Sequence, residues 1–407
     1  MDQSLKEEKK NPVIRRNYVL VISMAVILIV LSLICWFKRE DDFSESERRV
    51  LEKFPVISLE TVTNGKFMEE FEAYSLDQFP FRDQFRSIKA ITSYGFLQKK
   101  DNNSIYPAEG HLSKMEYPMQ IKMLDHAAMR LQEIYDMYLK EQKSTCYFSI
   151  VPDKNFFLAK ENGYLSMDYE ELTSYMREQV NFAKYIDISE FLELDDYYRT
   201  DTHWRQEKIV DVAEYLKEVM LAGESIDSNS IMSDDEAEIS LELSMEEKAG
   251  SNMYGNYEIK ELEIPFYGVY YGQSALPIKP DRLYYLDSEI LRQCKVTSYD
   301  TGKAKETVIY NMEKAYGNDA YEIFLSGTSA LQIIENPNAV QEKELLVFRD
   351  SFGSSLVPLL VDGYSKITVI DTRYVQSKML GNFVDFHGQD VLFIYSTVIL
   401  NNSMSLR

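Results

Sequence analysis

Cysteine, tryptophan and histidine are the scarcest chemically informative side chains in this sequence. Its 407 residues include three cysteines, two tryptophans and four histidines. So few cysteines do not indicate the disulfide framework of a small secreted scaffold. Cys35 lies in a long apolar segment, and the sequence leaves open whether Cys146 and Cys294 pair. We expect neither a metal nor another cofactor.

Basic residues are also fewer than acidic ones. The chain has 44 Lys and Arg against 66 Asp and Glu, and its net charge is −22 at pH 7. Such an acidic surface repels nucleic acids and anionic lipids, so we expect no nucleic-acid partner. Hydrophobic residues make up 45% of the chain, which excludes a disordered protein and suffices for one large domain or two ordinary ones.

Charged residues are absent from residues 18–37, which are apolar apart from Ser23 and Ser32. A helix needs about 20 such residues to cross a bilayer, so the segment predicts one transmembrane anchor. A cleaved signal peptide or a buried core helix is the alternative, but the run is longer than a usual signal core. Because Lys and Arg precede it and acids follow it, residues 1–17 are predicted to be cytoplasmic and the remainder extracytoplasmic.

The rest of the chain divides into a short segment and a long one. Residues 38–100 are polar with helical spacing of aromatic residues, and we interpret them as a juxtamembrane helical segment. Residues 101–407 alternate apolar runs of strand length with helix-length patterns, which is typical of an α/β domain: a parallel sheet with helices on both faces. The predicted strands are 146–151, 184–188, 344–348, 366–371 and 391–395. The predicted helices are 129–140, 169–183, 205–221, 354–364 and a segment after Arg373.

Two stretches interrupt this alternation. Residues 222–251 are acidic and poor in aromatic side chains, which indicates a surface insert. Residues 252–321 contain short tyrosine-rich pieces, and they predict an inserted β-rich segment. Clustered tyrosines can stack on sugar rings, although they are more often one face of a strand.

Asp201-Thr202-His203-Trp204 gathers two of the rarest residue types into four positions. In an extended chain, residues i and i+2 point the same way, so Asp201 and His203 can touch. A carboxylate bound to one imidazole nitrogen fixes the tautomer and leaves the other nitrogen free to accept a proton. The alternative is the solvated start of a helix.

A nucleophile for this pair is expected where a buried strand turns into a helix. In LLVFRDSFGSSLVPLL the strand ends at Arg349, and residues 350–353 form the turn. Ser351 then lies at the carboxyl end of the sheet, where ligands bind in doubly wound folds. Backbone N–H groups at the helix N-terminus can stabilise an oxyanion, and Gly353 allows a close backbone approach. The alternative is that Ser351 is only a helix N-cap.

The sequence resembles the DHHW family, within the AlgX/AlgJ-like group of SGNH-hydrolase-like proteins that acetylate secreted polysaccharides. The matching segments are DQFPFRD (77–83), VPDK (151–154), YYRTDTHW (197–204), FLSGTSA (324–330), RDSFGSSLVP (349–358) and IDTRY (370–374). Thr202 departs from the family name, which implies a histidine there. The aspartate and the histidine beside the tryptophan are both present.

The resemblance implies a triad in the permuted order Asp, His, Ser on an SGNH-like, flavodoxin-like sheet. Ser351 would attack an acyl donor, His203 would move its proton, and Asp201 would orient His203. Arg373 would bind the oxyanion or the substrate, unless it forms a structural ion pair. The other residues expected to contribute to oxyanion or substrate binding are Gly353, Arg349 and Trp204.

The leading hypothesis is therefore an anchored extracytoplasmic O-acyltransferase that acetylates a cell-envelope or secreted polysaccharide. The family also implies a separate acyl-donor membrane protein of the membrane-bound O-acyltransferase type. An esterase that uses water as the acceptor, and a catalytically silent glycan-binding or assembly protein, are the two alternatives. The sequence does not separate transfer from hydrolysis, because this depends on how well the site excludes water.

Overall fold

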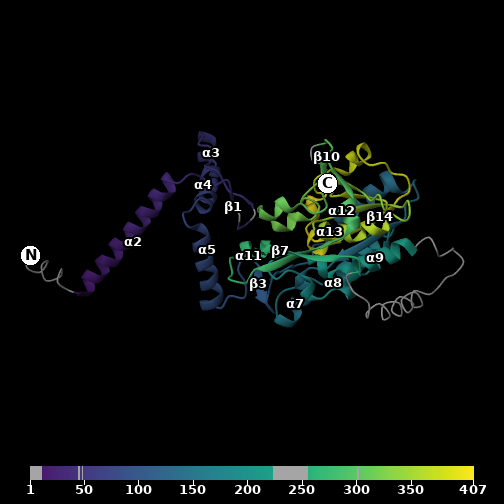
Figure 1. Cartoon of the computed structure of the whole chain (residues 1–407). Helices are drawn as coiled ribbons and strands as arrows, with labels where there is room; N and C mark the ends of the chain where they lie inside the picture. Colours follow the sequence, from purple (N-terminus) through teal and green to yellow (C-terminus); the bar gives the residue numbers. More distant parts are fainter. Residues whose placement is uncertain (1–11, 45, 48, 223–254, 300–301) are drawn as a thin grey trace, which may run out of the picture. The chain divides into compact units, whose positions relative to one another are not determined.

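The structure is a computed structural model that describes residues 12–44, 46–47, 49–222, 255–299 and 302–407 (Figure 1). The chain forms two compact units, one of residues 1–99 with 275–277 and the other of residues 100–274 with 278–407. The predicted acidic insert lies outside the described residues except for Ala222. All three cysteines are free, so Cys146 and Cys294 do not pair.

The first unit begins with the apolar helix α2 (Pro12–Phe37). This helix is long and apolar enough to cross a membrane over Pro12–Cys35, with a mean hydropathy of 3.0 in its best window. A signal sequence near the N-terminus can satisfy the same criteria of length and composition. The remaining elements of the unit are short: β1 (Phe43–Ser44), β2 (Arg49–Val50), α3 (Leu59–Thr63), α4 (Lys66–Asp77), α5 (Arg82–Ile91) and a π-helical turn (Thr92–Phe96).

The second unit is built on an eight-stranded sheet in the order β10-β9-β11-β13-β12-β14-β5-β6. Five strands are parallel, and they correspond to the five predicted ones: β5 (Cys146–Val151), β6 (Lys184–Tyr185), β12 (Glu344–Arg349), β13 (Lys366–Ile370) and β14 (Asp390–Ser396). The strand predicted at 184–188 ends early, because β6 is an edge strand that pairs through two residues only.

Three antiparallel strands at the other edge were not predicted to belong to this sheet. They are β9 (Lys295–Ser298), β10 (Lys305–Thr307) and β11 (Leu331–Glu335). Strands β9 and β10 come from the tyrosine-rich segment, which therefore does not form one separate β-rich body. Its other strands, β7 (Glu258–Phe266) and β8 (Asp281–Asp287), form their own antiparallel pair. The same segment also forms two short helices, α11 (Val269–Ser274) and α12 (Glu289–Gln293).

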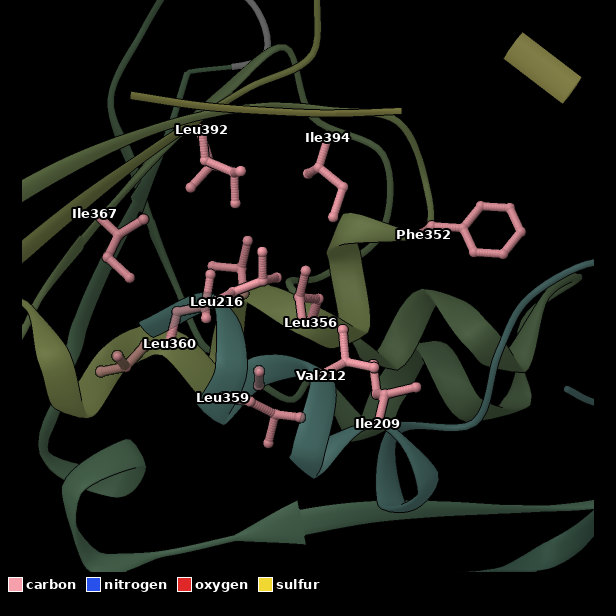
Figure 2. Close-up of a cluster of buried hydrophobic side chains, with 14 of the residues drawn as sticks. Ile209, Val212, Leu216, Phe352, Leu356, Leu359, Leu360, Ile367, Leu392 and Ile394 are labelled. Carbon is pink, nitrogen blue, oxygen red and sulfur yellow. The ribbon is translucent and has the colours of Figure 1, made fainter. Parts of the chain in front are cut away.

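Helices cover both faces of the sheet because alternate residues of each central strand point to opposite sides. Leu345 and Val347 of β12 pack with α9 (Val210–Ala222) and α13 (Gly353–Leu360), whose apolar side chains meet β13 and β14 in Figure 2. The intervening residues of β12 belong to the opposite cluster, with side chains of α6 (Ile121–Ile134) and α8 (Tyr169–Gln179). Both faces are thus apolar, as expected for continuous hydrophobic strands.

The remaining connections are short. They include the hairpin of β3 (Ile105–Ala108) and β4 (His111–Lys114), the helices α7 (Lys154–Asn162) and α14 (Thr397–Leu400), and several 3₁₀ turns. The helix predicted after Arg373 is a 3₁₀ helix, Ser377–Asn382. At the carboxyl ends of the parallel strands lie acidic side chains: Asp153 after β5, Asp350 after β12 and Asp371 after β13.

Candidate active site

The turn that carries Ser351 follows β12 directly. Asp350 organises it: its carboxylate accepts the Phe352 N–H at 2.9 Å, and its carbonyl accepts the Gly353 N–H at 3.2 Å. The second carboxylate oxygen accepts both the backbone N–H and the hydroxyl of Ser396, at 2.8 and 2.6 Å. The chain therefore reverses tightly at the end of the strand and holds Ser351 at its tip.

Ser351 is not the helix N-cap. Helix α13 begins at Gly353, and Phe352 occupies the N-cap position without a side-chain cap. The capping interpretation of Ser351 is therefore wrong, and its hydroxyl is directed to another partner. Within the described part of the chain, the Ser351 N–H has no hydrogen-bond acceptor, whereas those of Phe352 and Gly353 are bound to Asp350.

Asp201 and His203 lie in a loop that is closed by a β-bridge between Tyr197 and Trp204. The Tyr198 N–H donates to the His203 carbonyl at 3.0 Å. The next α-helix, α9, starts only at Val210. The helix-start interpretation of Asp201-Thr202-His203-Trp204 is therefore wrong: these residues form a buried loop, which we call the Asp-His loop (residues 197–204).

The structure brings Asp201, His203 and Ser351 into one line of hydrogen bonds. Nδ1 of His203 lies 2.6 Å from Oδ1 of Asp201, and Nε2 lies 2.8 Å from Oγ of Ser351. An ionised carboxylate only accepts, so Nδ1 carries the proton and Nε2 is free to accept from the serine hydroxyl. Asp201 is fully buried, and His203 is 7% exposed. This is the arrangement of a nucleophile, a general base and an orienting acid.

Tyr321, which no sequence pattern pointed to, lies against His203. Its ring stacks on the imidazole with centroids 4.0 Å apart and planes 8° apart, while Phe352 lies at 5.0 Å. The Tyr321 hydroxyl is 2.8 Å from Oγ of Ser355. Burial raises the pKa of Tyr321, so the phenol stays neutral. Two aromatic rings therefore restrict the rotation of the imidazole.

Trp204 connects the Asp-His loop to α13. Its side chain is fully buried, and the indole N–H donates to the Phe352 carbonyl and to Oγ of Ser355, each at 3.0 Å. The one donor of the indole is therefore already used within the protein, and the expected oxyanion or substrate role of Trp204 stays a prediction. Its position fixes the distance between His203 and Ser351.

Distant parts of the chain hold the Asp-His loop. The carboxylate of Asp281 accepts the N–H groups of Arg199 and Thr200 at 2.8 Å each, and also the Thr200 hydroxyl. The Tyr270 N–H donates to the Thr200 carbonyl at 3.0 Å. The Val269 N–H donates to the second oxygen of Asp201 at 2.7 Å. The loop is therefore shaped by α11 and β8.

Gly268 allows α11 to approach this closely. A Cβ atom at Gly268 would lie 2.3 Å from the Cβ and 2.4 Å from the Cα of Asp201, distances that real Cβ atoms do not reach. The Gly268 N–H also donates to the Thr200 hydroxyl at 2.9 Å. The sequence could not reveal this glycine, because its partner lies far away along the chain.

Thr202, the position that departs from the family name, is bound to Tyr270 rather than to a residue of the triad. Its hydroxyl accepts a hydrogen bond from the Tyr270 hydroxyl at 3.1 Å. The side chain therefore helps to attach the loop to α11. The line from Asp201 to Ser351 is complete without a second histidine.

The two arginines near the turn differ in their pairing. Arg373 donates to both oxygens of Asp371, at 2.9 and 2.6 Å. Burial lowers the pKa of Arg373, but the hydrogen bonds and charge of Asp371 outweigh it and hold the pKa above its usual value. The structural ion pair considered for Arg373 is therefore present.

Arg349 is 1% exposed, and burial lowers its pKa. Its guanidinium is 3.6 Å from Asp371 and donates to the Asp350 carbonyl at 3.2 Å. Its aliphatic part packs on Gly353, where a Cβ atom would lie 2.7 Å from that of Arg349. Gly353 therefore makes room for Arg349, and the predicted oxyanion or substrate roles of Arg349, Gly353 and Arg373 stay predictions.

A family model described as DHHW protein matches residues 242–370. The match contains the Ser351 turn, while the Asp-His loop precedes it. It agrees with the resemblance found in the sequence.

Solved structures show the same fold over most of the chain. PatB1 of Bacillus cereus, solved with a sulfonyl adduct, is 20% identical with a TM-score of 0.55, covering 73% of this chain and 95% of that one. A DHHW family protein from Eubacterium siraeum is 19% identical with a TM-score of 0.54, covering 75% and 95%. The fold is therefore the expected SGNH-like α/β fold.

A third solved structure, the O-acetyltransferase domain of Pseudomonas putida AlgJ, is 13% identical and covers 73% of this chain and 92% of that one. Its TM-score is 0.41. No curated protein matches the chain.

Proposed function

We propose that this chain is a membrane-anchored, extracytoplasmic serine O-acyltransferase that acetylates a cell-envelope or secreted polysaccharide. The observation that carries the proposal is the continuous line of hydrogen bonds from Asp201 through His203 to Ser351. The line lies at the carboxyl end of a parallel sheet, where α/β folds bind their ligands. The SGNH-like fold and the family match support the same reaction class.

In the first half of the reaction, Ser351 takes the acyl group. Oγ attacks the carbonyl carbon of the donor ester while Nε2 of His203 takes the hydroxyl proton. The tetrahedral intermediate then expels the donor oxygen, which leaves with the proton from His203. The Ser351 N–H, which has no acceptor among the described residues, then donates to the oxyanion. Asp201 stabilises the imidazolium that forms meanwhile.

In the second half, a sugar hydroxyl takes the place of the donor. His203 removes its proton as the oxygen attacks the acyl carbon, and the proton returns to Oγ of Ser351 when the acyl–serine bond breaks. Water entering at this stage would give a free carboxylic acid instead of an acylated sugar. The same residues therefore support transfer or hydrolysis, depending on the acceptor.

We also propose that the chain is attached to the membrane. Helix α2 serves as an uncleaved anchor, with residues 1–17 in the cytoplasm and the catalytic unit outside. One span offers no passage for an acyl group, so a multispanning membrane protein must deliver the donor. The polysaccharide acceptor and this donor protein follow from the family resemblance.

The test uses the full-length chain in detergent with a chromogenic acetyl ester, with and without an oligosaccharide acceptor. Release of the chromophore, an acetyl adduct on Ser351 by mass spectrometry and an acetylated oligosaccharide are expected. Chromophore release with no acetylated sugar would identify an esterase. Equal rates in the wild type and in Ser351→Ala would reject the triad and favour a glycan-binding protein.

A sulfonyl fluoride gives a second test that needs no substrate. The related PatB1 structure contains a sulfonyl adduct. If His203 activates Ser351 here, the reagent should add to Ser351 at neutral pH. His203→Ala should slow this labelling strongly, and Ser351→Ala should abolish it.

A further inference from the structure

Lys154 occupies an unfavourable position for a lysine. It is the first residue of α7, directly after the N-cap Asp153, and is 2% exposed. A positive charge at a helix N-terminus opposes the helix dipole, and burial removes the water that stabilises an ammonium group. Specific contacts must therefore offset these costs.

Those contacts are all with the Asp-His loop and its supports. Nζ of Lys154 donates to the Tyr198 carbonyl at 2.7 Å and to the Arg199 carbonyl at 3.4 Å. It also lies 5.1 Å from the ring centroid of Tyr270. Since Tyr198 and Arg199 lead into Thr200 and Asp201, the amine fixes the backbone immediately before the triad.

The charged and titratable groups around the amine are mostly acidic. Asp201, Asp281 and Asp153 act on Lys154 electrostatically, and the charge of Lys154 in turn helps to lower the pKa of His111. Burial lowers the pKa of Lys154 to about 7, and the three carboxylates oppose this effect. The groups that face it are Asp153 before α7, Asp201 in the loop, Asp281 at the start of β8, His111 in β4 and Tyr270 in α11.

We propose that Lys154 is a positioning residue for the acyl transfer: its hydrogen bonds hold the Asp-His loop, and its charge acts on the Asp201–His203 pair. This role rests on the proposed function, because it acts through His203. The expected electrostatic effect has a definite sign. A cation near Asp201 opposes the protonation of His203, so removing it should let His203 gain a proton at higher pH.

Two substitutions separate the hydrogen bonds from the charge. Lys154→Gln keeps an N–H donor and removes the charge, whereas Lys154→Met removes both. In both variants, the acidic midpoint of the rate–pH profile should move to higher pH by about half a unit or more. Turnover at the pH optimum should fall about tenfold or more in Lys154→Met and less in Lys154→Gln, because a displaced base slows proton transfer.

A second measurement follows the protonation of the His203 imidazole directly and needs no catalytic turnover. With labelled histidine in the full-length chain, NMR gives the pH midpoint of the His203 imidazole, which should rise in Lys154→Gln. Lys89, an exposed lysine of α5, provides the control, since Lys89→Gln should leave this midpoint unchanged. Folded Lys154→Gln with the wild-type midpoint would overturn the proposal.

If both Lys154 variants fail to fold, the titration of His203 in the wild-type protein still tests the proposal. Coupled groups titrate in shared steps, so the His203 resonance should show a second inflection near pH 7 when Lys154 loses its proton. A single inflection between pH 5 and 9 would reject the coupling. A shifted midpoint in a chain that cleaves no ester would instead reject the proposed function and keep only the coupling between Lys154 and His203.

Discussion

The Ser351 turn and the Asp-His loop meet at one site but are built in different ways. The turn is made by its own residues: Asp350 binds the N–H groups that follow it, and α13 continues from there. The loop is held by groups 68 to 82 positions further along the chain, in α11 and β8. A local turn can be recognised in a sequence, whereas a loop with distant supports cannot.

The two regions also differ in what surrounds them. Every residue of α13 is buried, and its apolar side chains anchor the turn in the core. The Asp-His loop instead buries polar groups, among them Thr200 and Asp201, which are fully buried. Thr200 and Asp201 are tolerated there because both are hydrogen-bonded, and losing one partner leaves another group unsatisfied. The loop should therefore respond to single polar substitutions more strongly than the turn.

The largest effect is expected from the residues that join the two regions. Ser351→Ala and His203→Ala should each reduce ester turnover by about 10⁶-fold, since neither works without the other. Asp201→Asn should retain more activity, with a loss on the order of 10⁴-fold, because the imidazole then favours the wrong tautomer. Steady-state kinetics measure the losses, and circular dichroism checks the fold. Equal losses for all three would contradict a purely orienting role for Asp201.

A pair of glycine substitutions compares the regions directly. Gly268→Ala forces Cβ onto the backbone and Cβ of Asp201, so the loop must move, and a shift of about 1 Å can cost about 100-fold in rate. Gly353→Ala meets the side chain of Arg349 instead, and the better helix propensity of alanine, about 1 kcal/mol, offsets part of the strain.

Turnover and thermal unfolding of both glycine variants provide the measurement. Gly268→Ala should lose activity out of proportion to stability, whereas Gly353→Ala should lose less activity. A more active Gly268→Ala than Gly353→Ala would show that the loop tolerates displacement better than the turn.

Trp204→Phe tests the connection between the regions with a smaller expected effect. The substitution keeps a large ring but leaves the Phe352 carbonyl without the indole donor. Among the described residues, the carbonyl then keeps only the 3.5 Å hydrogen bond from the Ser355 hydroxyl. One lost hydrogen bond costs about 0.5–1.5 kcal/mol. We expect that loss of stability in chemical denaturation, with turnover reduced about tenfold. Ser355→Ala is the companion variant: it removes the second acceptor of the indole and the partner of the Tyr321 hydroxyl, but keeps the indole bond to Phe352. Full stability in Trp204→Phe would show that the indole N–H is not needed.

Thr202→Val should give the smallest effect. It removes the acceptor of the Tyr270 hydroxyl and leaves the line from Asp201 to Ser351 intact. One hydrogen bond contributes about 1 kcal/mol, so we expect a loss of stability of that size and a turnover within about threefold of the wild type. Kinetics and denaturation measure both. A loss comparable to that of His203→Ala would assign Thr202 to the chemistry.

The five parallel strands and the Ser351 turn could be predicted because their signals are local. Apolar runs of strand length, and a serine between a strand and a helix, depend on neighbouring residues only. The same reasoning failed for the antiparallel strands β9 and β11, which join the sheet through pairing with distant strands. It also failed for residues 201–204 as a helix start, because the bridge between Tyr197 and Trp204 overrides the local pattern.

The sequence by itself determined the apolar segment of α2, the acidic charge, the α/β class and the three residues of the candidate triad. Only the tertiary structure decided which other residues hold Asp201, His203 and Ser351 in place. Tyr321 stacks on His203, Gly268 makes room for Asp201, and Lys154 holds the backbone before it. None of these carries a local signal, because stacking, close approach and the pairing of a buried charge depend on which distant segments the fold brings into contact.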